Sequence, residues 1–149
     1  MVLAKGRNSS FSHTIETSAA PDRIWRLWTD VSNWATWDGG LKSASMNGVF
    51  EVGASGQIVP LKGSRVPFTV TAAIPRTSST FVTKLPFAEL KIERSLVALP
   101  HNAGTRFTHH VSFTGPLREV WGFILGRGFR KELPKTMAKL AKCAEDGVQ

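Results

Sequence analysis

The sequence predicts an α+β fold in which a curved antiparallel β-sheet wraps around a long C-terminal α-helix. Three observations lead to this prediction. An alternating stretch at residues 11–17 is followed by two short helical patterns. About six strand-like stretches separated by short turns then fill residues 41–114. A helical pattern occupies residues 116–144. Short connections favour antiparallel neighbours, and a strongly twisted sheet of this size curls around a helix that crosses it.

The first stretch has the alternation of a half-buried strand. Its inward face is expected to carry Phe11, His13, Ile15 and Thr17. Pro21 suits the first turn of the helix that follows, and Asp22 favours its N-terminal end. Four of the five tryptophans lie between residues 25 and 37, where we expect them to wedge two short helices against the sheet. The alternative is that one of them lines a cavity.

The middle of the chain predicts strands of unequal strength. The predicted strands cover residues 41–46, 50–52, 56–61, 64–74, 80–85, 89–99 and 105–114. In the strong stretch 64–74, one face is expected to carry Val66, Phe68, Val70, Ala72 and Ile74.

The C-terminal pattern contains two sets of apolar residues that do not share one helix face. The phase changes across Gly126 and Gly128, and Pro134 removes an intrahelical hydrogen bond. We therefore predict a long helix with a kink or break between Gly126 and Pro134. At about 1.5 Å per residue it would be about 40 Å long, enough to cross a small domain.

Length and composition narrow the class of protein. A chain of 149 residues predicts one domain, residues 1–149, with an ordered core at about 11–145. The single cysteine, Cys143, cannot form an internal disulfide, which favours a reducing compartment. There is no long apolar run, and the first residues lack the apolar core of a signal peptide. We expect a cytoplasmic protein, without a cofactor, and no His/Cys/Asp spacing indicates a metal site.

The formal charge of +8 permits contact with anionic partners. Much of it lies late in the chain, at Arg118, Arg127, Arg130, Lys131, Lys135, Lys139 and Lys142. The simplest interpretation is the solvated face of a helix, and the alternative is a weak contact with an anionic membrane surface. No zinc-finger spacing or RNP-like motif supports specific binding of nucleic acid. The sequence leaves open whether the protein is a monomer or a homodimer.

The tryptophan-rich region also carries a family resemblance. The stretch APDRIWRLWTDV at residues 20–31, with Trp34 to Trp37 and Asp38 after it, resembles the START/Bet v 1-like (SRPBCC) superfamily, in particular its bacterial polyketide cyclase/dehydrase-like members. The end of the chain, from Leu133 to Glu145, is similar to that superfamily's terminal helix. The resemblance implies a helix-grip fold with an apolar cavity between sheet and helix. Members bind lipids, sterols, polyketides or hormones, and a minority catalyse cyclisation or dehydration.

Two polar residues interrupt apolar strand faces. Arg94 shares a face with Ile92 and Leu96, and His109 shares one with Phe107 and Val111. A buried guanidinium needs a polar partner or an anionic ligand, and a histidine can exchange protons near neutral pH. Their strands are expected to form a hairpin, so both side chains could share one face of the sheet. The simpler interpretations are an arginine that reaches water and a hydrogen-bonded core histidine.

The remaining candidates for a ligand-binding cavity are apolar. They are Phe68, Val70, Phe81, Ile92, Leu96, Phe107, Trp121 and Leu125.

Three functions remain open at this point. The first is binding of a hydrophobic small molecule, such as a lipid or polyketide, between sheet and helix. The second is a cyclase/dehydrase-type enzyme with His109 as general acid/base and Arg94 stabilising an enolate. The third is an interaction or membrane-surface protein that uses the basic C-terminal helix.

Overall fold

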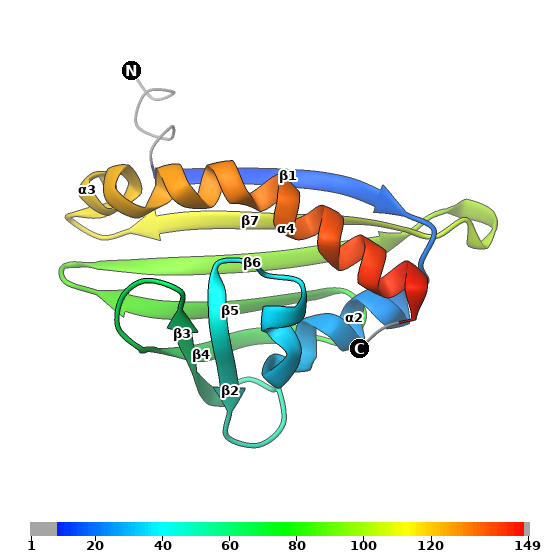
Figure 1. Ribbon diagram of the computed structural model, residues 1–149, viewed down its shortest axis with the longest axis horizontal. Helices are drawn as coiled ribbons and strands as arrows, with labels where there is room; N and C mark the ends of the chain where they lie inside the picture. Colours follow the sequence, from blue (N-terminus) through cyan, green and yellow to red (C-terminus); the bar gives the residue numbers. More distant parts are fainter. Residues whose placement is uncertain (1–8, 148–149) are drawn as a thin grey trace.

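Seven antiparallel strands form one curved sheet in this computed structural model, which describes residues 9–147 (Figure 1). The spatial order of the strands is β1-β7-β6-β5-β4-β3-β2. Their bounds are β1 Ser10–Thr17, β2 Leu41–Met46, β3 Ser55–Pro60, β4 Val66–Ile74, β5 Ser78–Leu85, β6 Ala88–Ala98 and β7 Thr105–Thr114. The first eight residues, on which the signal-peptide prediction depends, lie outside the described part of the chain.

Helices cover the concave side of this sheet. The helix α2 (Pro21–Thr29) and the 3₁₀ helix η1 (Val31–Thr36) connect β1 to β2, and a short 3₁₀ turn η2 (Pro100–Asn102) connects β6 to β7. The chain ends in a continuous helical stretch built from α3 (Arg118–Trp121), a π-helical turn η3 (Gly122–Gly126) and α4 (Arg127–Asp146). The predicted α+β fold, with two short helices after the first strand and a long helix at the end, is confirmed.

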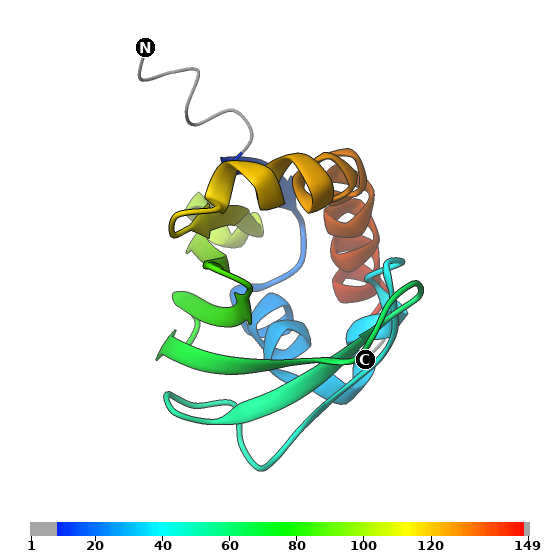
Figure 2. The same ribbon diagram turned by 90° about the vertical axis from the view of Figure 1, so that its left-hand side faces the viewer.

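The irregularity in the long helix lies earlier than predicted. It is the π turn at Gly122–Gly126, and α4 then continues through Pro134 without ending. Figure 2 shows the gold first part of the helix running in a different direction from the red last part. Pro134 is tolerated because its neighbours are fixed by packing: Leu133 and Met137 are both buried in the core.

The strand predictions need two corrections. Residues 50–52 form no strand and belong to the loop between β2 and β3. In β4 the register shifts between Val70 and Ala72, so Ala73 packs against the core and Ile74 is exposed. Such a bulge reverses the inward and outward faces beyond it, and strict alternation cannot predict it.

The second half of the long helix packs its apolar side into the core. Its buried side consists of Leu133, Met137, Leu140, Ala141 and Ala144. Burial of a Leu or Met side chain contributes about 1.5–3 kcal/mol. At the end of α4, Thr17 donates a hydrogen bond to Glu145 (2.5 Å) and Arg23 donates one to the carbonyl of Ala144 (3.2 Å). These contacts attach the C-terminal end of α4 to β1 and α2.

Candidate functional site

Arg94 and His109 lie side by side on the inner face of the sheet. Arg94 on β6 is the cross-strand partner of His109 on β7, and it also pairs in register with Ser79 on β5. Only 5% of Arg94 and 2% of His109 is exposed, and Ser79 is buried as well. The sequence left open whether Arg94 points inward or reaches water, and the structure places it inward, beside His109.

An aromatic cage surrounds the guanidinium of Arg94. The Cζ atom lies 4.8 Å from the ring centroid of Trp34, 5.0 Å from that of Phe81 and 5.2 Å from that of Trp37. Trp34 and Trp37 reach the same guanidinium because side chains three residues apart align in a 3₁₀ helix, and η1 ends next to Trp37. Cation–π contacts of this kind compensate part of the cost of removing the charge from water.

The donors in this cage are not all paired. In residues 9–147, Nε and Nη1 of Arg94, Nε1 of Trp37 and Oγ of Ser79 are buried without a hydrogen-bond partner. Three of these atoms can only donate, and the serine hydroxyl can also donate. Buried polar atoms in native proteins are nearly always paired. The natural complement of such a group is an acceptor oxygen, and a charged one forms the stronger bonds.

Asp38 interacts electrostatically with Arg94 but forms no direct ion pair with it. No ion pair within 4.0 Å joins the two residues in the described chain, and Oδ1 of Asp38 accepts a hydrogen bond from the backbone N–H of Gly40 (3.0 Å). Burial raises the pKa of Asp38, while the Gly40 hydrogen bond and the Arg94 charge partly offset that rise. Burial lowers the pKa of Arg94 to about 10, so the guanidinium stays charged at neutral pH.

His109 is held as a neutral acceptor. Its Nε2 accepts a hydrogen bond from Nε1 of Trp28 (3.0 Å), which places the ring proton on Nδ1. The rings of Trp28 and Phe107 contact it with centroid distances of 5.7 and 5.8 Å. Burial is the largest cause that lowers its pKa well below 6.5, followed by the charges of Arg94 and His13. With Nε2 already occupied, the imidazole fits a structural acceptor better than an acid.

The apolar candidates divide into two groups. Five are buried in the core around the cage, and Ile92 packs against it half-buried. Those five are Phe68, Val70, Phe81, Leu96 and Phe107. Trp121 and Leu125 are half-buried in the first part of the long helix. Nε1 of Trp121 donates a hydrogen bond to the carbonyl of Pro86 (2.9 Å), which lies at the β5–β6 turn. At about 3.3 Å per residue, this turn is about 20 Å from Arg94 along β6. The structure does not bring Trp121 to the cage.

The sequence interpretation missed four residues of this site: Trp34, Trp37, Asp38 and Ser79. The W-x-x-W-D pattern indicates a wedge, a single cavity-lining tryptophan as the alternative, and a family resemblance, but none of these predicts that both tryptophans contact Arg94. Ser79 lay just outside the predicted strand 80–85, and β5 begins at Ser78. We call Arg94, Ser79, Trp34, Trp37 and Phe81 the arginine cage.

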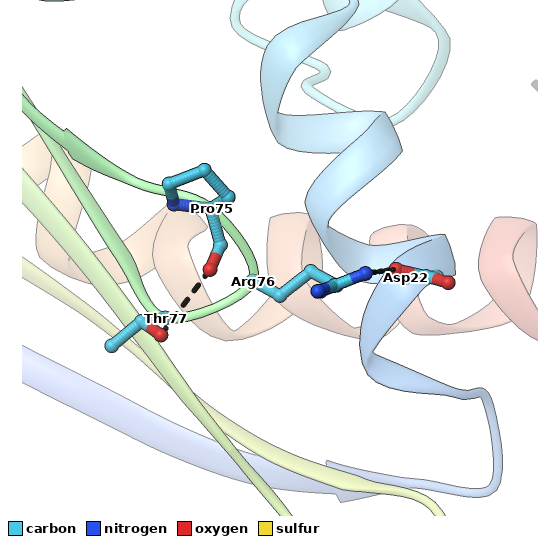
Figure 3. Close-up of polar contacts among 4 residues, drawn as sticks. All are labelled: Asp22, Pro75, Arg76 and Thr77. Atoms are coloured by element: carbon cyan, nitrogen blue, oxygen red, sulfur yellow. Dashed lines mark hydrogen bonds and ion pairs between the residues drawn. The ribbon is translucent and has the colours of Figure 1, made fainter.

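Two hollows in the described chain lie at the surface. One is lined by Ala20, Pro21, Asp22 and Arg76, and the other lies beside it near Ser18 and Leu99. In the first, Arg76 from the β4–β5 turn contacts Asp22 at the start of α2 (3.4 Å), and Thr77 donates to the carbonyl of Pro75 (Figure 3). Both charged groups are exposed and already paired, so this hollow is a weaker candidate for ligand binding than the arginine cage.

Fold and site together define a helix-grip protein of the Bet v 1 type. The chain belongs to the family described as polyketide cyclase/dehydrase and lipid transport, whose model matches residues 9–145. The resemblance drawn from the tryptophan-rich region is therefore confirmed, and the family supports a fold that binds hydrophobic ligands.

Solved structures show the same fold at low identity. Protein MLL2253 from Mesorhizobium loti is 18% identical with a TM-score of 0.73, and the match covers 94% of this chain and 98% of that one. Ara h 8.0201 is 10% identical with a TM-score of 0.71, covering 92% and 97%. Protein CV1439 from Chromobacterium violaceum is 15% identical with a TM-score of 0.69, again covering 92% and 97%. No curated protein matches the sequence significantly.

Within residues 9–147, no helix is both long and apolar enough to cross a membrane. No group of three or more His, Cys, Asp or Glu side chains there is arranged to hold a metal ion.

Proposed function

We propose that this protein binds a hydrophobic small molecule whose acidic oxygen head is held by the arginine cage. The observation that carries the proposal is the set of buried donors without acceptors on Arg94, Trp37 and Ser79. A carboxylate or similar oxyanion would accept from the guanidinium and from the indole or hydroxyl at once. The aromatic rings around the cage would contact the apolar body of the ligand.

Binding requires a local rearrangement, because aromatic side chains fill the space inside the sheet. Trp28, Trp34, Trp37, Phe68 and Phe107 are all almost fully buried. Trp34 lies on η1 and Trp37 directly follows it, and η1 is a single short 3₁₀ helix without a side-chain cap. Hydrogen-bond geometry in 3₁₀ helices is poorer than in α-helices, which favours η1 as the element that moves. We therefore propose that η1 moves outward when the ligand enters.

Binding is favoured over catalysis by the state of His109. A general acid/base needs a free nitrogen and a pKa near the working pH. His109 has its Nε2 occupied by Trp28 and a pKa held well below 6.5, mainly by burial. We accordingly assign His109 the role of positioning Trp28 against the sheet. The half-buried thiol of Cys143 is free, which fits the cytoplasmic location that we propose.

The test compares ligands that differ only in the head group. Dodecanoic acid is paired with dodecanol, and naphthoic acid with naphthalenemethanol, and binding is measured by tryptophan fluorescence and by thermal shift. A charge-assisted hydrogen bond contributes about 1.5–3 kcal/mol, so each acid should bind at least about tenfold more tightly than its alcohol. Arg94→Met should remove this preference while Lys91→Met, on the outer face of the same strand, should keep it.

Either of two results would overturn the proposal. One is equal affinity of the wild-type protein for acid and alcohol in both pairs. The other is a preference for the acid that survives in the Arg94→Met variant.

A further inference from the structure

In the first part of the long helix, large apolar side chains face solvent and glycines occupy the buried positions. In a typical surface helix the large apolar side chains face the core. Here the buried positions of residues 118–126 are Gly122 and Gly126, whereas Val120, Phe123 and Ile124 are 48%, 57% and 58% exposed. Trp121 and Leu125 in the same segment are half-buried, but Val120, Phe123 and Ile124 contribute little to the core of the folded chain. The exposed side chains therefore indicate contact with something outside the molecule.

A second element extends the same apolar surface. Phe87, at the β5–β6 turn, is 74% exposed, and its carbonyl accepts a hydrogen bond from the N–H of Leu117 (3.0 Å). Its φ of 56° is in the left-handed region, which costs a non-glycine residue on the order of 1 kcal/mol or more. The turn and the helix start therefore hold Phe87 in place despite that strain. We call Phe87, Leu117, Val120, Phe123 and Ile124 the end patch, and Figure 2 looks onto this end of the molecule.

Basic side chains border the end patch. The segment 116–131 carries four basic residues, Arg118, Arg127, Arg130 and Lys131, and one acidic residue, Glu119. The guanidinium of Arg127 lies 5.3 Å from the ring centroid of Phe123, and Glu119 lies 4.0 Å from Arg118. Apolar and basic groups thus occupy the same short helical segment. Helices that lie in the interface of an anionic membrane combine these two features.

The positive charge around the end patch argues against two other binding partners for it, a second copy of the chain and the first eight residues of the chain itself. A second copy of the chain would bring the same basic border to the contact, within a molecule of formal charge +8. The first eight residues carry Lys5 and Arg7 and no acidic residue. Neither complements the border electrostatically, whereas anionic phospholipid head groups do.

We propose that the end patch docks on the surface of an anionic lipid bilayer. Phe87, Phe123 and Ile124 enter the boundary between head groups and acyl chains. Arg127 and Lys131 contact the lipid phosphates. The docked orientation brings the lipid surface to the π turn of the long helix, and this inference does not depend on the arginine cage.

The test uses vesicles of phosphatidylcholine alone and vesicles of phosphatidylcholine mixed with phosphatidylglycerol, with binding measured by flotation at low and high salt. The wild-type protein should float with the mixed vesicles at low salt and dissociate at high salt, because exposed charges are screened. The double variant Phe123→Ser, Ile124→Ser and the double variant Arg127→Gln, Lys131→Gln should each weaken binding at least about tenfold.

Two matched controls should bind as the wild type does. Lys135→Gln with Lys139→Gln removes the same charge from the next turns of the helix. Ile74→Ser with Val97→Ser removes two apolar side chains that are equally exposed elsewhere. All substituted side chains are exposed, and thermal melts by circular dichroism check that each variant is folded.

Five outcomes would overturn the proposal. The first is no binding to mixed vesicles, and the second is equal binding to both vesicle types at high salt. The third is a loss of binding in the controls as large as in the end-patch variants. The fourth is a dimer that Phe123→Ser, Ile124→Ser abolishes, which would assign the surface to a second copy. The fifth is binding of polyglutamate in place of vesicles, which would assign the surface to an acidic protein.

Discussion

At the scale of single residues, His109 gives the protein a predictable response to acid. The unfolded chain binds a proton at this histidine below about pH 6.5, but the folded protein does not, because its pKa is lowered by burial, Arg94 and His13. The contribution of His109 to stability is therefore complete above about pH 6.5 and is lost as the pH falls below it. The loss is at most about 1.4 kcal/mol for each pH unit.

The variant His109→Gln isolates this effect, because a glutamine oxygen can still accept from Trp28 and does not titrate. Urea unfolding at a series of pH values from about 7.5 to 5 should show the wild type losing free energy of unfolding more steeply than the variant. Asp38 acts with the opposite sign, since its raised pKa lets the folded state bind a proton first, but it does so equally in both proteins. Parallel pH profiles would contradict the account.

Alternation of period two placed Arg94 and His109 on apolar strand faces, but it left open whether Arg94 points inward or reaches water. The cage around Arg94 could not be predicted in the same way. Trp34 and Trp37 lie on a 3₁₀ turn whose direction depends on how η1 packs over the sheet, and no periodicity encodes that packing. Ser79 required a strand boundary accurate to one residue, which propensities do not supply.

At the scale of elements, the long helix has one firmly packed half and one loosely packed half. We expect backbone amides of residues 118–126 to exchange with solvent faster than those of residues 133–146. In the first segment only glycines are fully buried, with Trp121 and Leu125 half-buried, whereas the second segment buries Leu133, Met137, Leu140, Ala141 and Ala144. Opening of the first segment thus exposes little apolar surface and costs little free energy. Hydrogen exchange measured by mass spectrometry provides the comparison within one helix, and uniform protection along it would contradict the expectation.

The elements also show where sequence patterns stop being informative. The order of strands and helices follows from alternation, turn residues and helical spacing, and apart from the absent strand at residues 50–52 it is confirmed from β1 to α4. The bulge in β4 and the π turn each insert one residue into a regular repeat. Both change which face a side chain occupies, and neither has a distinctive composition. Regular alternation therefore predicts Ile74 inside the sheet, and regular helical spacing predicts the irregular turn beyond Gly126.

At the scale of the whole molecule, a charged group in an aromatic core should lower stability unless function requires it. Arg94 is buried, has no ion pair within the described residues and leaves two donor atoms unpaired. Replacement of such a group by an apolar side chain of similar volume is often neutral or stabilising. We therefore expect Arg94→Met to have a free energy of unfolding within about 1 kcal/mol of the wild type, or higher.

Urea unfolding tests this expectation, and a second variant in the same core gives the reference for a large loss of stability. Phe81→Ala, which removes a wall of the arginine cage, should cost about 3–5 kcal/mol. In the Arg94→Met variant, the carboxylate of Asp38 loses the nearby positive charge, which could itself lower the stability. The double variant Arg94→Met, Asp38→Asn removes that negative charge, and its amide oxygen can still accept the hydrogen bond from Gly40. Comparison of the two variants separates the effect of the carboxylate from that of the arginine. A loss of several kcal/mol in both Arg94 variants would make the arginine a structural residue. Retained stability combined with a lost preference for acidic ligands would show that the chain keeps an unpaired charge in its core for binding.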